Sequence, residues 1–141
     1  MYRRTLAFAA LLVGFTSSVS AAEEPLTVVQ DLASHWMAAY NGGDARTLAD
    51  LYITDATFLS GLVGALKGRQ EIEAAISRLM KQSPHITFTP REAHQSGDVI
   101  WAYWDYTIVG GPSGYGMITA VRQPDAWRIA MHTSNVRPRA P

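Results

Sequence analysis

Two titratable residues within predicted strands, Asp105 and His132, are the candidates for acid–base chemistry in this sequence. A histidine near the end of the last predicted strand can act as a base or an acid at neutral pH. A carboxylate can orient such a histidine when both side chains point into the same cavity. The alternative is structural: His132 then satisfies a hydrogen bond in the core, and Asp105 reaches solvent.

Other kinds of catalytic site are poorly supported. The absence of cysteine excludes disulfides, thiolate zinc sites, iron–sulfur clusters and a cysteine nucleophile. No phosphate-binding Gly-rich loop precedes a helix, and no Gly-x-Ser-x-Gly motif is present. We therefore expect neither a metal nor a cofactor. The histidines, which share no metal-ligand spacing, are His35, His85, His94 and His132.

The charge balance argues against a polyanionic partner. Of the 141 residues, 12 are Lys or Arg and 12 are Asp or Glu. Binding to nucleic acid or to an anionic membrane surface would call for a basic excess. We therefore expect no nucleic-acid partner, and a small molecule is the better candidate.

The first 22 residues have the pattern of a secretory signal peptide. A positive start at Arg3 and Arg4 precedes the uncharged segment 5–22, which has an apolar centre and ends in small residues. An uncleaved membrane anchor is the alternative, but the apolar part is short for a spanning helix. We expect an exported protein, periplasmic or secreted, whose mature part is a single slightly acidic domain of residues 23–141. After cleavage we expect no membrane association. The arginine pair leaves Sec and twin-arginine export both open.

Helical periodicity in the first half of the mature chain gives way to strand-like alternation in the second half. Helices are predicted at 26–40, after an N-cap at Asp44, and at 69–82. Pro90 makes the second predicted strand irregular or an edge strand. The segment 61–68 is expected to be a loop, and Thr54-Asp55 a turn. Strands are predicted at 56–60, 85–93, 99–109, 115–122 and 127–134.

Helices followed by a meander predict an α+β fold, with a curled antiparallel sheet packed against three N-terminal helices. Such a sheet forms a cone with an interior pocket. The strand 99–109 is apolar on both faces, so a second protein surface is expected to cover one of them. We expect a homodimer through the sheet. The residues assigned to the covered face are Ile100, Ala102, Trp104, Tyr106 and Ile108.

The order of these elements resembles the nuclear transport factor 2-like superfamily, and within it the SnoaL-like and ketosteroid isomerase-like branch. The segments that carry the resemblance are 36–44, 48–52, 55–58, 67–69 and 127–134. The resemblance implies the cone, or cystatin-like, fold over nearly the whole mature chain. This branch of the superfamily includes many small secreted proteins of unknown function.

The chemistry of the ketosteroid isomerases does not carry over with the fold. Their helix tyrosine, which donates to an oxyanion, corresponds to Trp36, and their first-strand carboxylate corresponds to Ser60. The returning strand holds no Asp or Glu for the third role. Thr119 stands where related hub domains place a ligand-binding arginine. The candidate pocket residues are Trp36, Tyr40, Phe58, Ser60, Tyr103, Met117 and Thr119.

Three functions of different classes remain open. The first is an exported pocket protein that binds a small apolar or aromatic molecule. The second is an acid–base enzyme, similar to an isomerase, cyclase or hydratase, that uses His132 and Asp105. The third is a dimerising association module without a ligand.

Overall fold

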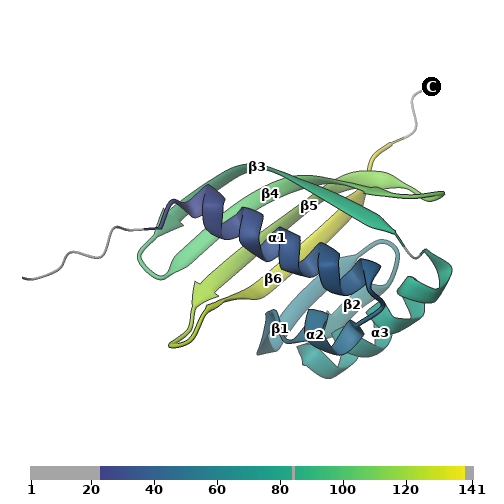
Figure 1. Ribbon diagram of the computed structural model, residues 1–141, viewed down its shortest axis with the longest axis horizontal. Helices are drawn as coiled ribbons and strands as arrows, with labels where there is room; N and C mark the ends of the chain where they lie inside the picture. The colour runs from purple at the N-terminus through teal and green to yellow at the C-terminus, as the bar shows by residue number, and fades with distance from the viewer. Residues whose placement is uncertain (1–22, 84, 139–141) are drawn as a thin grey trace, which may run out of the picture.

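The computed structural model describes residues 23–83 and 85–138, so the predicted signal segment lies outside the described residues. The described chain folds into helices and strands around one apolar core (Figure 1). The elements are α1 (Pro25–Asn41), α2 (Ala45–Ala49), β1 (Tyr52–Ser60), β2 (Gly64–Lys67), α3 (Gly68–Gln82), β3 (Ile86–Ser96), β4 (Val99–Ile108), β5 (Ser113–Arg122) and β6 (Trp127–Val136).

The strands form one curled sheet that does not close into a barrel, in the order β2-β1-β6-β5-β4-β3. All neighbouring strands are antiparallel except β1 and β6, which are parallel. The predicted curled sheet packed against three helices is confirmed, and it is mixed rather than antiparallel throughout. The chain leaves β2 through α3 and crosses to the far edge at β3. The meander from β3 to β6 then returns alongside β1, in the same direction as β1.

Two local expectations are corrected near β1. The segment expected to be a loop contains β2, which pairs with the end of β1 in a hairpin. The expected turn at Thr54-Asp55 lies inside β1, where the pairing register with β6 shifts between Tyr52 and Thr57. The irregularity at these positions is therefore a bulge rather than a chain reversal.

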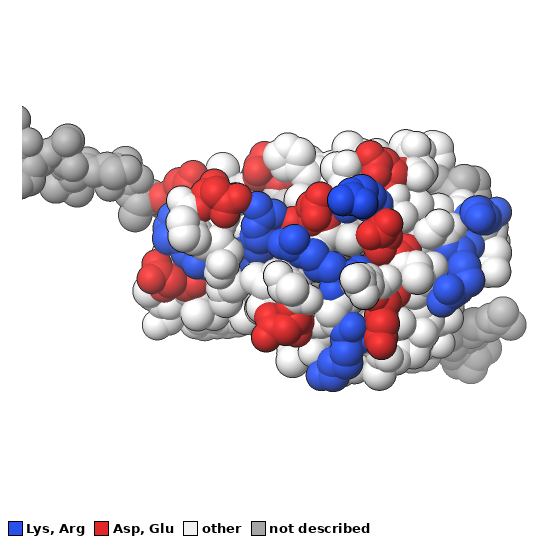
Figure 2. All heavy atoms as spheres, turned by 90° about the horizontal axis from the view of Figure 1, so that it is seen from below, with Lys and Arg blue, Asp and Glu red and all other residues white. Residues whose placement is uncertain are grey.

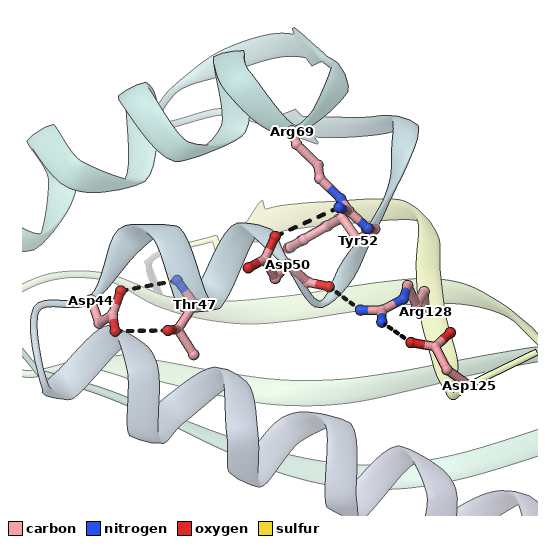
Figure 3. Close-up of polar contacts among 7 residues, drawn as sticks. All are labelled: Asp44, Thr47, Asp50, Tyr52, Arg69, Asp125 and Arg128. Carbon is pink, nitrogen blue, oxygen red and sulfur yellow. Dashed lines mark hydrogen bonds and ion pairs between the residues drawn. The ribbon is translucent and has the colours of Figure 1, made fainter. Parts of the chain in front are cut away.

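The helices form as their sequence patterns predicted. The predicted apolar face of α1, which includes Val29, Leu32 and Trp36, is at most 5% exposed. Asp44 caps α2, because the Thr47 amide donates to its Oδ1 at 2.9 Å and the Thr47 hydroxyl to its Oδ2 at 2.7 Å (Figure 3). In Figure 1, α1 lies across one face of the sheet, and α2 and α3 lie beside β1 and β2.

Among the described residues, no helix is both long enough and apolar enough to span a bilayer.

The edge position predicted from Pro90 is confirmed. Strand β3 pairs only with β4, and its register shifts between Pro90 and Glu92. Proline has no amide hydrogen to donate, so an edge strand with a bulge accommodates it.

The face of β4 assigned to a dimer partner is instead the inner face of the monomer. Its even-numbered residues are at most 3% exposed and belong to the core. The outer face carries the odd-numbered residues, among them Trp101 at 42% and Tyr103 at 39% exposure. The two faces were assigned the wrong way round, because the outer set also contains Val99, Trp101 and Tyr103 beside the polar Asp105 and Thr107. The corrected inner residues are Ile100, Ala102, Trp104, Tyr106 and Ile108.

Candidate functional site

His132 is the centre of an aromatic cluster inside the curled sheet. It lies on β6 between Phe58 of β1 and Ile118 of β5, and only 1% of its surface is exposed. The Phe58 ring stacks on the imidazole with 4.3 Å between centroids and planes 5° apart. The Trp104 ring meets it edge-on, at 5.3 Å and 89°. The imidazole is therefore shielded from water by aromatic groups.

A buried chain of hydrogen bonds holds His132 from behind. The Trp36 indole Nε1–H donates to the Tyr52 hydroxyl at 2.9 Å. The same hydroxyl lies 2.7 Å from His132 Nδ1. Tyr52 is fully buried, so no water competes for its hydroxyl. The chain thus connects α1, β1 and β6 through side chains that are far apart in the sequence.

Arginines from two elements anchor the start of β1 and so place Tyr52 (Figure 3). Arg69 at the start of α3 donates from Nε to the Tyr52 carbonyl at 2.6 Å, and its Nη1 lies 3.6 Å from Asp50 Oδ1. Arg128 of β6 donates to the Asp50 carbonyl and is paired with Asp125. Both arginines therefore hold the backbone at the start of β1, and this backbone carries the Tyr52 side chain.

Burial keeps this site uncharged at neutral pH. Desolvation lowers the pKa of His132 to about 3, which favours the neutral imidazole. Desolvation also raises the pKa of Tyr52 above its usual range and raises the pKa of Tyr106. At neutral pH all three side chains are therefore uncharged, and His132 holds no extra proton to give as an acid.

A small cavity of about 20 Å³ lies on the open side of His132. A cavity needs roughly 10–15 Å³ to hold one water molecule, so this cavity has room for about one. Its lining is aromatic and aliphatic with a few hydroxyls, and no Asp, Glu, Lys or Arg contributes to it. The lining residues are Trp36, Phe58, Ser60, Leu62, Ile76, Leu79, Ile86, Phe88, Tyr106, Ile108, His132 and Ser134.

Three buried polar atoms in the described residues have no hydrogen-bond partner: Trp104 Nε1, Tyr106 Oη and His132 Nε2. Two of these side chains, Tyr106 and His132, line the cavity. The third, Trp104, makes edge-to-face contact with His132. Buried polar groups in folded proteins nearly always have a partner, so this cluster calls for an explanation.

Two glycines on β5 make room for these side chains. Trp104 pairs across the sheet with Gly116, and Tyr106 pairs with Gly114. A Cβ at position 116 would lie 2.8 Å from Trp104 Cδ1, and one at position 114 would lie 2.8 Å from Tyr106 Cζ. The rings therefore lie across β5 toward β6, over positions that have no side chain. Glycines two positions apart at 114 and 116 are the sequence signal for this arrangement, which was not among the predictions made from the sequence.

Two serines separate the cavity from a hollow at the surface. Ser134 donates to Ser60 Oγ at 2.8 Å, and the Leu62 amide donates to the same oxygen at 3.1 Å. Both serines line the inner cavity and also a surface hollow of about 410 Å³. Leu62 lines the cavity and is 42% exposed. The turn between β1 and β2 therefore lies at the mouth of the cavity.

The predicted pocket residues divide between the two faces of the sheet. Trp36, Phe58 and Ser60 line the cavity. Tyr40 is buried behind Trp36, with ring centroids 5.1 Å apart, and its hydroxyl donates to the Ser83 carbonyl at 2.7 Å. The other three lie on the outer face of β4 and β5, because inward residues on these strands have even numbers. These outward residues are Tyr103, Met117 and Thr119.

Asp105 and His132 do not form the pair that the sequence suggested. Asp105 lies on the outer face of β4, where Arg91 contacts its Oδ2 through Nη2 at 2.7 Å and Nε at 2.8 Å. Arg137 contacts its other carboxylate oxygen at 3.4 Å. His132 faces inward and has Tyr52 as its partner. Tyr52 and Tyr106 were not predicted to belong to the site, since nothing in the spacing of either tyrosine distinguishes it from a core residue.

In residues 23–83 and 85–138, no three His, Asp or Glu side chains are placed to hold a metal ion. A larger surface hollow, of about 880 Å³, lies between α1 and the turn from β5 to β6, and is lined by acidic and basic residues together. On the face drawn in Figure 2, the two signs of charge are interspersed rather than gathered into one patch.

The comparison with protein families agrees with this architecture. The model of the SnoaL-like domain matches residues 33–132, which span α1 to His132 itself. The chain belongs to the SnoaL-like domain family. Among curated proteins, none matches the sequence. The resemblance inferred from the sequence is therefore confirmed at the level of the family and fold.

Solved structures similar to this SnoaL-like domain show the same fold at low sequence identity. A protein of unknown function from Mycobacterium tuberculosis has a TM-score of 0.68 and 17% identity, over 79% of this chain and 71% of that one. A nuclear transport factor 2-like protein from Streptomyces avermitilis, provisionally named a dehydratase, has a TM-score of 0.67 and 19% identity, over 81% and 96%. A protein from Novosphingobium aromaticivorans, provisionally named an aromatic ring hydroxylase, has a TM-score of 0.66 and 16% identity, over 81% and 90%.

Removal of the Tyr52 hydroxyl tests the buried chain in this SnoaL-like domain. We expect Tyr52→Phe to lower the free energy of unfolding by about 2–4 kcal/mol, because the Trp36 N–H and His132 Nδ1 both lose their partner. Thr107→Val, which removes an exposed hydroxyl on the outer face of β4, is the control and should change it by less than about 0.5 kcal/mol. Urea denaturation measures both. Equal stability of the two variants would contradict the buried chain.

The pH dependence of stability tests the neutral state of His132. Below pH 6.5 the unfolded chain binds a proton at this histidine, whereas the folded protein does not until about pH 3. The free energy of unfolding is therefore not reduced by His132 above pH 6.5. As the pH falls from 6.5 towards 3, the unequal protonation of His132 lowers it by about 1.4 kcal/mol per pH unit. The His132→Gln variant should lack this contribution in denaturant titrations between pH 6 and 4. NMR provides the direct check, and a titration midpoint of the His132 ring near 6.5 would refute the assignment.

Proposed function

We propose that this SnoaL-like domain binds a small, mainly apolar or aromatic molecule in the cavity beside His132. The observation that carries the proposal is the pair of unpartnered polar atoms, His132 Nε2 and Tyr106 Oη, beside an otherwise aromatic and aliphatic cavity. A few convergent polar groups in an apolar enclosure are typical of small-molecule sites. A bound molecule would supply the hydrogen-bond partner that the protein itself does not.

Binding of a ring-sized molecule requires the cavity to open. An apolar cavity that accepts benzene measures about 150 Å³, whereas the closed cavity here measures about 20 Å³. The mouth is the part best suited to move, because Leu62 is partly exposed and a single side-chain hydrogen bond joins Ser60 to Ser134. The aromatic walls behind His132 are anchored and remain in place.

Binding is better supported than catalysis. An acid–base enzyme that uses His132 with Asp105 is not supported, since the two residues lie on opposite faces of the sheet. His132 is neutral at pH 7, and its Nδ1 is already engaged by Tyr52. The provisional names of the Streptomyces and Novosphingobium relatives refer to enzymes of two different classes, so they favour no single reaction here.

Calorimetric titration with ethylbenzene and acetophenone tests the binding site. We expect at least one of these one-ring probes to bind and to raise the melting temperature. Ser134→Leu places a larger side chain in the cavity wall and should weaken binding at least about tenfold, which corresponds to roughly 1.4 kcal/mol. The neighbouring variant Thr133→Leu is the control, because Thr133 lines the surface hollow but not the inner cavity. Absence of binding by both probes would contradict the proposed function.

We also propose that the domain forms a homodimer through the outer face of its sheet. Six large apolar or aromatic residues are exposed on the outer face of the neighbouring strands β4, β5 and β6, and they alternate with the buried inner residues. A two-fold symmetric pair would bury the same patch on both copies. The patch consists of Val99, Trp101, Tyr103, Tyr115, Met117 and Met131.

Sedimentation at micromolar concentration tests the dimer. We expect the wild-type domain to sediment as a dimer, and Trp101→Glu to sediment as a folded monomer because a buried, unpaired charge is costly. Val109→Glu is the matched control, since Val109 is 65% exposed in the turn after β4 and lies outside the patch. A wild-type protein that sediments as a monomer would rule out this interface.

The export of the protein is also proposed, on the basis of the signal pattern in residues 1–22. Intact-mass measurement of the protein from its native host should give a mature chain that begins at Glu23. A chain of full length in the soluble cytoplasmic fraction would contradict export.

A further inference from the structure

We propose that the ligand of this cavity carries a neutral acceptor oxygen, a ketone, aldehyde or amide carbonyl, which accepts a hydrogen bond from a donor left unpartnered beside the cavity, His132 Nε2–H or Tyr106 Oη–H. The inference rests on the proposed binding function and specifies the chemical class of the molecule bound. It follows from the direction of the buried hydrogen bonds, from the position of the unpartnered atoms and from the lack of charge in the cavity.

The buried chain determines which imidazole nitrogen carries the proton. An indole nitrogen can only donate, so the Tyr52 oxygen accepts from Trp36. The hydrogen of Tyr52 then has His132 Nδ1, at 2.7 Å, as its acceptor. The opposite arrangement would leave the Tyr52 hydrogen without an acceptor in a fully buried position. Nδ1 of the neutral imidazole is therefore the acceptor, and Nε2 carries the hydrogen.

The unpartnered atoms beside the cavity can consequently all donate. His132 presents Nε2–H, Tyr106 presents its hydroxyl, and Trp104 presents an indole N–H that cannot accept. The three residues follow one another along the inner face of the sheet. Tyr106 is level with Gly114 of β5, Trp104 with Gly116, and His132 with Ile118. A molecule that offers an acceptor satisfies this group, whereas a molecule that offers only a donor satisfies at most the Tyr106 oxygen.

The charge of the ligand follows from the lining. No acidic or basic side chain lines the cavity, and His132 is neutral. A carboxylate or phosphate would lose its hydration here without gaining a cation, which is costly. A neutral carbonyl requires only hydrogen-bond donors. The stacked rings of Phe58 and Phe88 around His132 and Trp104 suit a flat, apolar body attached to that carbonyl.

The first test measures the tautomer in the unliganded protein. In ¹⁵N-labelled wild-type protein, NMR should show the His132 ring proton bonded to Nε2, with Nδ1 as an acceptor. A proton found on Nδ1 instead would overturn the proposal, because Nε2 would then have no hydrogen to donate.

The second test compares acetophenone with ethylbenzene, which has nearly the same shape but lacks the carbonyl oxygen, and with benzoate. We expect acetophenone to bind wild-type protein at least about tenfold more tightly than ethylbenzene, and benzoate to bind more weakly than acetophenone. The carbonyl stretch of bound acetophenone should lie at lower frequency than in an alkane solvent. Equal affinities for acetophenone and ethylbenzene would overturn the carbonyl inference but leave the apolar pocket standing. Failure of both to bind would overturn the pocket itself.

The third test removes one donor without disturbing the fold. Because the Tyr106 hydroxyl has no partner in the unliganded structure, Tyr106→Phe should not lower the melting temperature. It should reduce the preference for acetophenone over ethylbenzene by about fivefold or more. Thr107→Val, which removes a hydroxyl from the exposed outer face of the same strand outside the proposed dimer patch, is the control and should leave that preference unchanged. An unchanged preference in Tyr106→Phe would overturn the role of this hydroxyl.

Discussion

The hydrogen-bond chain from Trp36 through Tyr52 to His132 crosses the core and connects the longest helix to the two strands that are parallel to each other. Each of its members is almost fully buried, so each polar atom in the chain depends on the next one for a partner. The chain aligns the imidazole and assigns its hydrogen to the side that faces the cavity. The arginine contacts to the start of β1 and the aromatic stack on Phe58 maintain the same geometry.

The inner face of the sheet therefore presents only uncharged groups to the cavity. The resemblance to the ketosteroid isomerases places Trp36 at the position of their oxyanion-donating tyrosine and Ser60 at the position of their proton-transferring carboxylate. What faces the cavity instead is a neutral histidine, a phenol and nearby aromatic rings. Such groups can orient a ligand oxygen, but they offer no charged acid or base at neutral pH. The family fold is thus retained with different chemistry at its centre.

Two glycines and two serines control the space around this site. Gly114 and Gly116 let large rings lie across β5, which fills most of the cone and leaves only a small cavity. Ser60 and Ser134 separate that cavity from the surface hollow. The site is therefore closely packed on the strand side and is separated from the surface hollow by a thin polar boundary at the mouth. The exposed aromatic residues of the outer face do not contribute to the cavity.

Much of this architecture was determined by the sequence alone. The apolar periodicity of α1, the cap at Asp44 and the proline in β3 act through nearest neighbours, so the helices, the edge strand and the family were predictable. Tertiary structure decided which face of β4 is buried, since three of the five outer residues are apolar or aromatic and only Asp105 and Thr107 distinguish the outer set from the inner one. It separated Asp105 from His132 and joined His132 to Tyr52, 80 positions away. Such contacts depend on the register between strands, and strand register is set by the packing of the whole sheet rather than by local spacing.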